Sequence, residues 1–364
     1  MLKKMKMRKT LSLFLSAVII TSLAACSSSA SKTSSSKNAI PANAGANTPS
    51  TASSPEKKDW KIAVVVKDST NAWFVRMGEG VKKFASDTGL NAFQKGPAKT
   101  DAAMQVQVIQ DLLSQNLDAL CVDPVDPAAV EPVLKKAQDK GILVICHEGS
   151  SVKNCKYDIE AFNNADYGAF IMDNLSKSMG EKGTYTTMVA DVTNASHNEW
   201  ADAGVKQQQS KYPDMTLLSS AKRVESHDNS ETAYEKAKEL FKKYPDLKGI
   251  MGTSSKDAPG IARAIEELGL KGKIFVSGTG MPNECRQYIK NGTLSSITLW
   301  DPAGSGYAMC ALAEKILDGE SVKDGIDLGV DGYKSMKFLS GSDKVIIGSA
   351  QIVIDKKNID QYHF

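Results

Sequence analysis

The sequence has few of the side chains that metal sites and hydrolases use. Its 364 residues include four histidines and six cysteines, with no Cys-x-x-Cys pair and no His-Glu-x-x-His motif. A structural zinc site therefore has little support, and we expect no bound metal. The Gly-x-Ser-x-Gly elbow of serine hydrolases is absent, and Ser196 beside His197 has no identifiable orienting acid. We expect a protein that is not an enzyme.

Phosphate-binding glycine loops and a basic surplus are also missing. Residues 67–74, which follow the first apolar run, contain no glycine, and no Walker A sequence occurs elsewhere. Dinucleotides need such glycines for close backbone approach, so we expect no cofactor. Five of the positive charges lie in residues 1–9; subtracting them from the net charge of +3 leaves −2. A mildly acidic body argues against nucleic-acid binding and favours a small, nearly neutral partner.

The N-terminus has the pattern of an export signal followed by a tether. Residues 1–9 are basic, residues 11–23 are apolar, and Leu23-Ala24-Ala25 leads into Cys26. This ending resembles the lipobox of bacterial lipoproteins, which implies that residues 1–25 are removed and that Cys26 is acylated. A plain cleavage site beside a free cysteine is the alternative. Residues 26–58, rich in Ser, Ala, Thr, Asn and Pro, predict a disordered tether. We expect an extracytoplasmic protein, lipid-anchored to the cell membrane.

From residue 60 onward, short Val-, Ile- and Leu-rich runs alternate with segments of helical period. This alternation is typical of parallel sheets covered by helices on both faces. Three such strand–helix repeats and a fourth strand occupy residues 61–146, and the pattern restarts after residue 163. The last run, residues 345–354, predicts one late strand. The fold class expected is α/β, with two Rossmann-like bodies in sequence.

Parallel sheets bind ligands beyond the carboxyl ends of their strands, so the residues just after the strands are the candidates for a site. In the first body, Lys67 follows the first strand and Glu148 follows the fourth. Two adjacent aromatic residues, Trp73 and Phe74, open the next helix, and one of them is expected to offer a flat face to a sugar-like ring. The second body contributes Ser196, His197, Asn198, Thr253, Ser255 and Asp301.

Together these side chains offer hydroxyls, amides, carboxylates, one ammonium and aromatic faces, a mixture that suits a small, neutral, polyhydroxylated molecule. Asp301 has a second interpretation, because an aspartate before a helix often caps it. Lys67 has one too, as a solvated charge. If His197 contacts the ligand, affinity is expected to change around pH 6–7, near the ordinary imidazole pKa of about 6.5.

The chain from Trp60 to Phe364 resembles the sugar-type, class I periplasmic binding proteins that feed ABC importers. Within that family it is most similar to the autoinducer-2 receptor of the Lsr transport system and its rhamnose-binding relatives, above all in residues 299–301 and 358–364. The resemblance implies two Rossmann-like lobes joined by a three-segment hinge. It places residues 59–162 and about 302–340 in the N-terminal lobe, and residues 163–301 and about 341–364 in the C-terminal lobe.

The resemblance also implies a ligand set. The receptors' lysine is kept as Lys67 and their aspartate becomes Glu148, while an adjacent aspartate and glutamine become Ser196 and His197. A proline and an alanine, whose contacts are made largely by the backbone, become Thr253 and Ser255. The function implied is capture of autoinducer-2 between the lobes by a monomer that delivers it to the permease of an ABC importer. The alternatives are a neutral sugar such as rhamnose or a pentose, and a sensor input to a chemoreceptor or histidine kinase.

Overall fold

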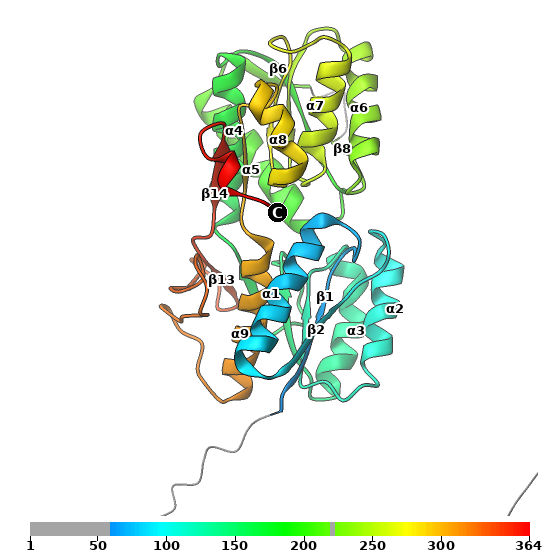
Figure 1. Ribbon diagram of the computed structural model, residues 1–364, viewed down its shortest axis with the longest axis vertical. Helices are drawn as coiled ribbons and strands as arrows, with labels where there is room; N and C mark the ends of the chain where they lie inside the picture. Colours follow the sequence, from blue (N-terminus) through cyan, green and yellow to red (C-terminus); the bar gives the residue numbers. More distant parts are fainter. Residues whose placement is uncertain (1–58, 219–222) are drawn as a thin grey trace, which may run out of the picture. The chain divides into compact units, whose positions relative to one another are not determined.

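The computed structural model describes residues 59–218 and 223–364 (Figure 1). The predicted signal peptide, the predicted lipidation site Cys26 and the predicted tether lie outside the described residues. Within the described ranges, no helix combines the length and the apolar character needed to span a bilayer.

The first lobe, as we use the term, is a seven-stranded sheet with its covering helices. The strand order is β12-β13-β5-β4-β3-β1-β2, and every neighbouring pair is parallel except β12 with β13. The strands are β1 (Lys61–Val65), β2 (Asn91–Lys95), β3 (Ala119–Val122), β4 (Leu143–His147), β5 (Tyr157–Glu160), β12 (Lys337–Phe338) and β13 (Val345–Ile347). The helices are α1 (Ala72–Thr88), α2 (Ala102–Leu112), α3 (Pro127–Asp139) and α9 (Pro302–Leu317).

Alternate residues of β1 face opposite sides of this sheet, as strand geometry requires. Ile62 and Val64 belong to the core formed with α1 and α9, whereas Ala63 and Val65 belong to the core formed with α2 and α3. Helices α1 and α9 lie side by side in Figure 1. Both faces of the sheet are therefore covered, which explains why its central strands are almost wholly apolar.

The second lobe is built on a five-stranded parallel sheet of order β10-β9-β6-β7, with β8 also paired to β6. Its strands are β6 (Gly183–Val189), β7 (Met215–Leu217), β8 (Val224–Glu225), β9 (Leu247–Gly252) and β10 (Phe275–Gly278). Its helices are α4 (Asn164–Met179), α5 (Ala195–Lys211), α6 (Ser230–Lys243), α7 (Asp257–Glu267) and α8 (Pro282–Asn291), followed late in the chain by the short 3₁₀ helix η1 (Ile359–Gln361). The predicted α/β class with two parallel-sheet bodies is confirmed.

The chain passes between the lobes at three places. It leaves the first sheet after β5 and enters α4, and it returns from β11 (Ser296–Leu299) into α9. It crosses again between β13 and β14 (Ile352–Asp355), which pairs antiparallel with β11. A bridge from Thr279 to Thr298 joins β11 to the end of β10.

The C-terminal segment differs from the prediction. The expected single strand over residues 345–354 is two strands in different sheets, since β13 pairs with β5 and β14 pairs with β11. The first lobe therefore extends to at least Ile347 rather than ending near residue 340. The polar residues between the two strands carry no periodic signal, so the sequence pattern merged them.

Candidate functional site

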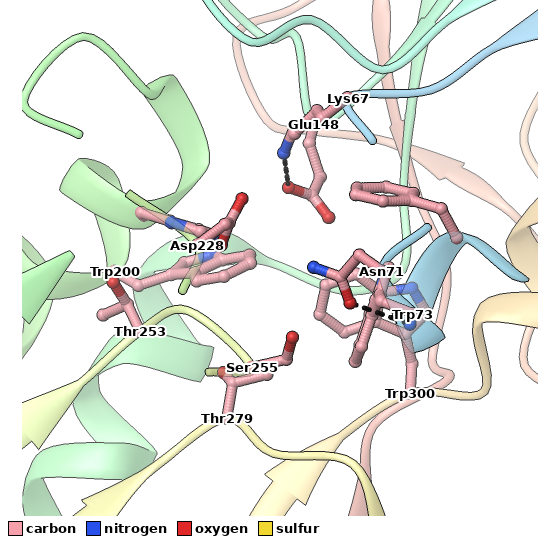
Figure 2. A pocket seen from close by; sticks show the side chains of 12 residues that line it. Lys67, Asn71, Trp73, Glu148, Trp200, Asp228, Thr253, Ser255, Thr279 and Trp300 are labelled. Atoms are coloured by element: carbon pink, nitrogen blue, oxygen red, sulfur yellow. Dashed lines mark hydrogen bonds and ion pairs between the residues drawn. The ribbon is translucent and has the colours of Figure 1, made fainter. Parts of the chain in front are cut away.

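A pocket lies where strand ends of both sheets come together. The space between its lining side chains, open solvent included, is about 300 Å³. Figure 2 shows Lys67 and Glu148 entering from above, Asp228 and Trp200 from the left, and Asn71 from the right. The lining residues are Lys67, Asn71, Trp73, Phe74, Glu148, His197, Trp200, Asp228, Thr253, Ser255, Thr279 and Trp300.

The first lobe contributes a buried ion-pair network. Lys67 Nζ lies 2.7 Å from Glu148 Oε2 and 2.9 Å from Asp123 Oδ1, and all three side chains are almost inaccessible to solvent. Burial opposes the charge of Lys67, but the carboxylates of Asp123, Glu148 and Asp228 together hold its pKa above the ordinary value. Burial also opposes the charge of Glu148, yet Lys67 and the neighbouring histidines lower its pKa to about 2. Burial raises the pKa of Asp123 well above its ordinary value.

Glu148 is held in place by an unusual backbone conformation at the end of β4. Its φ of 54° is in the left-handed region, which non-glycine residues rarely adopt. The imidazole of the preceding residue, His147, fixes the end of β4, because its Nδ1 atom lies 2.7 Å from the carbonyl oxygen of Ile159 on β5. From the second lobe, Ser196 Oγ donates to Glu148 Oε2 at 2.8 Å. One carboxylate oxygen therefore receives both the lysine and a hydroxyl from the opposite lobe.

The start of α5 places the imidazole of the second lobe. Asn194 caps this helix by accepting the His197 amide, and His197 Nδ1 accepts the amide of Ala190 at 3.3 Å. Burial is the main reason that the pKa of His197 falls to about 4. A pKa lowered in this way moves the titration of His197 below the pH 6–7 range in which the sequence predicts an effect on ligand affinity.

A buried carboxylate shapes the loop that follows β9. Asp257 Oδ2 accepts the amides of Thr253 and Ser254, each at 2.9 Å, which turns Thr253 and Ser255 toward the pocket. Desolvation raises the pKa of Asp257 to about 7, although the hydrogen bonds to Ser226 and to the backbone oppose that rise. Ser254 Oγ donates to Asp228 Oδ1 at 2.5 Å.

Aromatic rings form the remaining walls. Trp73 meets Trp300 edge to face with 4.6 Å between ring centroids, and Trp200 meets Trp300 at 5.7 Å. The sequence predicts that one of Trp73 and Phe74 faces the ligand, and both line the pocket. Such rings offer apolar faces to the C–H groups of a small cyclic molecule.

Seven of the ten predicted ligand residues line this pocket, and three do not. Ser196 lies behind Glu148, to which it is bonded. The Asn198 amide donates to the carbonyls of Asp191 and Asn194 and so fastens its own helix. Asp301 caps α9 through the Ala303 amide and makes a two-point ion pair with Arg76. The predicted placement of Asn198 and Asp301 in the pocket is therefore corrected, because both side chains form hydrogen bonds with backbone groups at helix starts instead.

Five lining residues were not predicted: Asn71, Trp200, Asp228, Thr279 and Trp300. Thr279 and Trp300 directly follow β10 and β11, so the strand-end rule identifies them when it is applied to those strands. Asn71 is the N-cap of α1. Asp228 follows β8, which has only two residues and gives no pattern to detect.

Three groups at the first-lobe wall have metal-ligand chemistry. Ligand atoms of Asp123, His147 and Glu148 lie within 4.8 Å of one another. The Lys67 ammonium already contacts both carboxylates, so the cation of this cluster is the lysine itself.

Comparisons of the sequence and of the structure with known proteins agree with one another. A family model described as a periplasmic binding protein domain matches residues 62–321. The ribose import binding protein RbsB of Bacillus subtilis is 25% identical over 276 residues, which are 74% of this chain and 86% of that protein. The structure of LsrB from Clostridium saccharobutylicum in complex with AI-2 is similar with a TM-score of 0.77 and 25% identity, covering 84% of this chain and 100% of that one. An ABC transporter solute binding protein from Clostridium phytofermentas with bound L-rhamnose gives 0.75 and 21% identity, with 84% and 98% covered.

Proposed function

Because this chain belongs to the type I periplasmic binding proteins, we propose that it captures one small, neutral, polyhydroxylated ligand between its lobes and presents it to the permease of an ABC importer. The similar proteins named above are binding proteins, and a role as a binding protein without catalysis is part of this proposal. The predicted lipid anchor at Cys26, the extracytoplasmic location and the monomeric state belong to it as well.

The main support for a neutral ligand is the ion-pair network of the first lobe. Lys67 is the one cationic side chain that lines the described pocket, and two carboxylates already compensate it. An anionic ligand would have to displace Asp123 or Glu148 from the ammonium, at the cost of a buried unpaired charge. Hydroxyl groups can instead share the remaining lone pairs of Glu148 and the hydroxyls of Thr253, Ser255 and Thr279.

Within this class, autoinducer-2 is the first ligand to test. Two observations favour it: the similarity to LsrB, and the lysine–carboxylate pair formed by Lys67 and Glu148. A neutral sugar such as rhamnose or a pentose is the second candidate. It is favoured by the aromatic walls of Trp73, Trp200 and Trp300, which suit the apolar face of a sugar ring.

The deciding experiment purifies the protein from cells that make autoinducer-2 and from cells that cannot. Heat denaturation releases any bound molecule, which a bioluminescent reporter then detects. Signal from the producing cells alone supports autoinducer-2. If neither sample gives a signal, calorimetric titration with rhamnose, ribose, xylose and arabinose tests the sugar alternative. Absence of binding in both experiments contradicts the neutral-polyol proposal.

A further inference from the structure

Asp228 is a lining carboxylate for which the described residues supply no direct ion pair. Among the described residues, no lysine, arginine or histidine lies within ion-pair distance of its carboxylate, whereas Glu148 is paired with Lys67. The Lys67 ammonium contacts Glu148 and Asp123 at the opposite wall and attracts the Asp228 carboxylate only at longer range. Asp228 therefore presents a carboxylate without a direct ion pair on the second-lobe side of the pocket.

The backbone that holds Asp228 is strained. His227 and Asp228 have φ values of 53° and 50°, so two successive non-glycine residues occupy the left-handed region. Each such residue costs free energy and persists only where its surroundings impose it. Here the His227 amide donates to Ala190 at 2.8 Å and the Asn229 amide donates to Ser226 at 3.1 Å. The loop thus keeps an unfavourable conformation that brings a carboxylate to the pocket (Figure 2).

The protein itself uses only part of the hydrogen-bonding capacity of the Asp228 carboxylate. Ser254 Oγ donates to its Oδ1 atom, and no hydrogen bond from the described residues reaches its Oδ2 atom. The Ser254 contact fixes the rotation of the group and leaves acceptor sites for a ligand. A carboxylate has about four lone-pair sites, which suits neighbouring hydroxyls of one molecule.

We propose that Asp228 is a ligand-binding, specificity-determining residue that accepts hydrogen bonds from hydroxyl groups of the ligand. This inference rests on the proposed function, and it names the second-lobe anchor that faces the paired Glu148 of the first lobe. Ligands without hydroxyl donors at that side of the ring are then discriminated against, because they leave a carboxylate unsatisfied.

The test compares Asp228→Asn with Asp191→Asn. Asp191 pairs with His227 in the same region but does not line the pocket, so its substitution disturbs the loop without touching the ligand. Calorimetry uses whichever of autoinducer-2, rhamnose, ribose, xylose or arabinose binds the wild-type protein. Asp228→Asn is expected to raise Kd by roughly 10- to 100-fold, the range for a hydrogen bond to a charged group. Asp191→Asn is expected to change it less than about twofold, within the usual range for surface substitutions.

Each outcome decides something. A Kd for Asp228→Asn within twofold of wild type overturns the inference and leaves the proposed function standing. Equal weakening by both substitutions also overturns it, since the loop rather than the carboxylate would then be responsible. Absence of wild-type binding to all five probes contradicts the proposed function, and this inference with it. The unfolding temperature of each ligand-free variant, expected to match wild type, separates loss of binding from loss of folding.

Discussion

The first-lobe wall of the pocket contains a buried ion-pair network, whereas the second-lobe wall consists of hydroxyls, an imidazole, an indole and one carboxylate without a direct ion pair. Lys67 forms ion pairs with both Asp123 and Glu148 within the protein itself. Thr253, Ser255 and Asp228 offer groups that the protein itself uses only in part. The comparison suggests a division of roles, in which the first wall is preorganised and the second selects the ligand.

The largest effect is expected from removing the shared cation. Lys67→Met removes the only cation in direct contact with two buried carboxylates of the described chain, so the free energy of unfolding should fall by about 3–5 kcal/mol. Urea denaturation measures this loss, and Lys82→Met on the exposed face of α1 is the matched control. A loss similar to that of the control would mean that the first wall is not held together by its ion pairs.

The two walls are expected to respond oppositely to pH. The pKa of Glu148 is lowered to about 2, so its stabilising contribution is present above pH 4–5 and is lost as pH falls toward 2. The pKa of Asp257, behind the second wall, is raised to about 7, so its contribution is present below pH 4 and is lost as pH rises toward 7.

Asp257→Asn tests the second of these signs. The stability of wild type relative to this variant should decrease by on the order of 2–4 kcal/mol between pH 4 and pH 7, because only wild type must ionise a buried carboxyl. Urea denaturation of both proteins across this range measures the difference. Parallel stability curves would show that Asp257 does not titrate there, and the contrast between the walls would be lost.

A smaller effect is expected where the two walls touch. Ser196→Ala removes the hydroxyl that donates to Glu148 across the lobes, and the free energy of unfolding should fall by about 1–2 kcal/mol. Ser210→Ala is the control, because Ser210 lies on the same helix and is exposed. If the two variants are equally stable, the hydroxyl does not tie the walls together.

The smallest expected effect is at His197. Since burial lowers its pKa to about 4, its ring signals should not shift between pH 5.5 and pH 8. Nuclear magnetic resonance of the four-histidine protein measures this directly, and His197→Gln assigns the signal. A midpoint near 6.5 would mean that the second wall is wetter than the structure indicates.

The same contrast explains what the sequence could predict. Lys67 and Glu148 follow β1 and β4, whose buried apolar runs make both strand ends visible in the sequence. Asp123 follows β3 in the same way, but its role depends on a distance to Lys67 that no local pattern encodes. Asp228 follows a strand of two residues and adopts a conformation set by the surrounding loop.

The errors have the same origin. Asn198 and Asp301 are residue types that suit a ligand and a helix end equally well, and only the folded chain decides between the two. Strands β13 and β14 are close in sequence but belong to different sheets, a long-range pairing that a local pattern does not contain.

The placement of tryptophan gives the protein an optical property. Three of the four tryptophans, Trp73, Trp200 and Trp300, line the pocket, while Trp60 lies apart and donates to Asp318. Most of the intrinsic indole emission is therefore expected to originate at the walls of this pocket. A ligand that replaces water there should change both the intensity and the wavelength of that emission. Ligand binding can therefore be followed by the intrinsic fluorescence of the unlabelled protein.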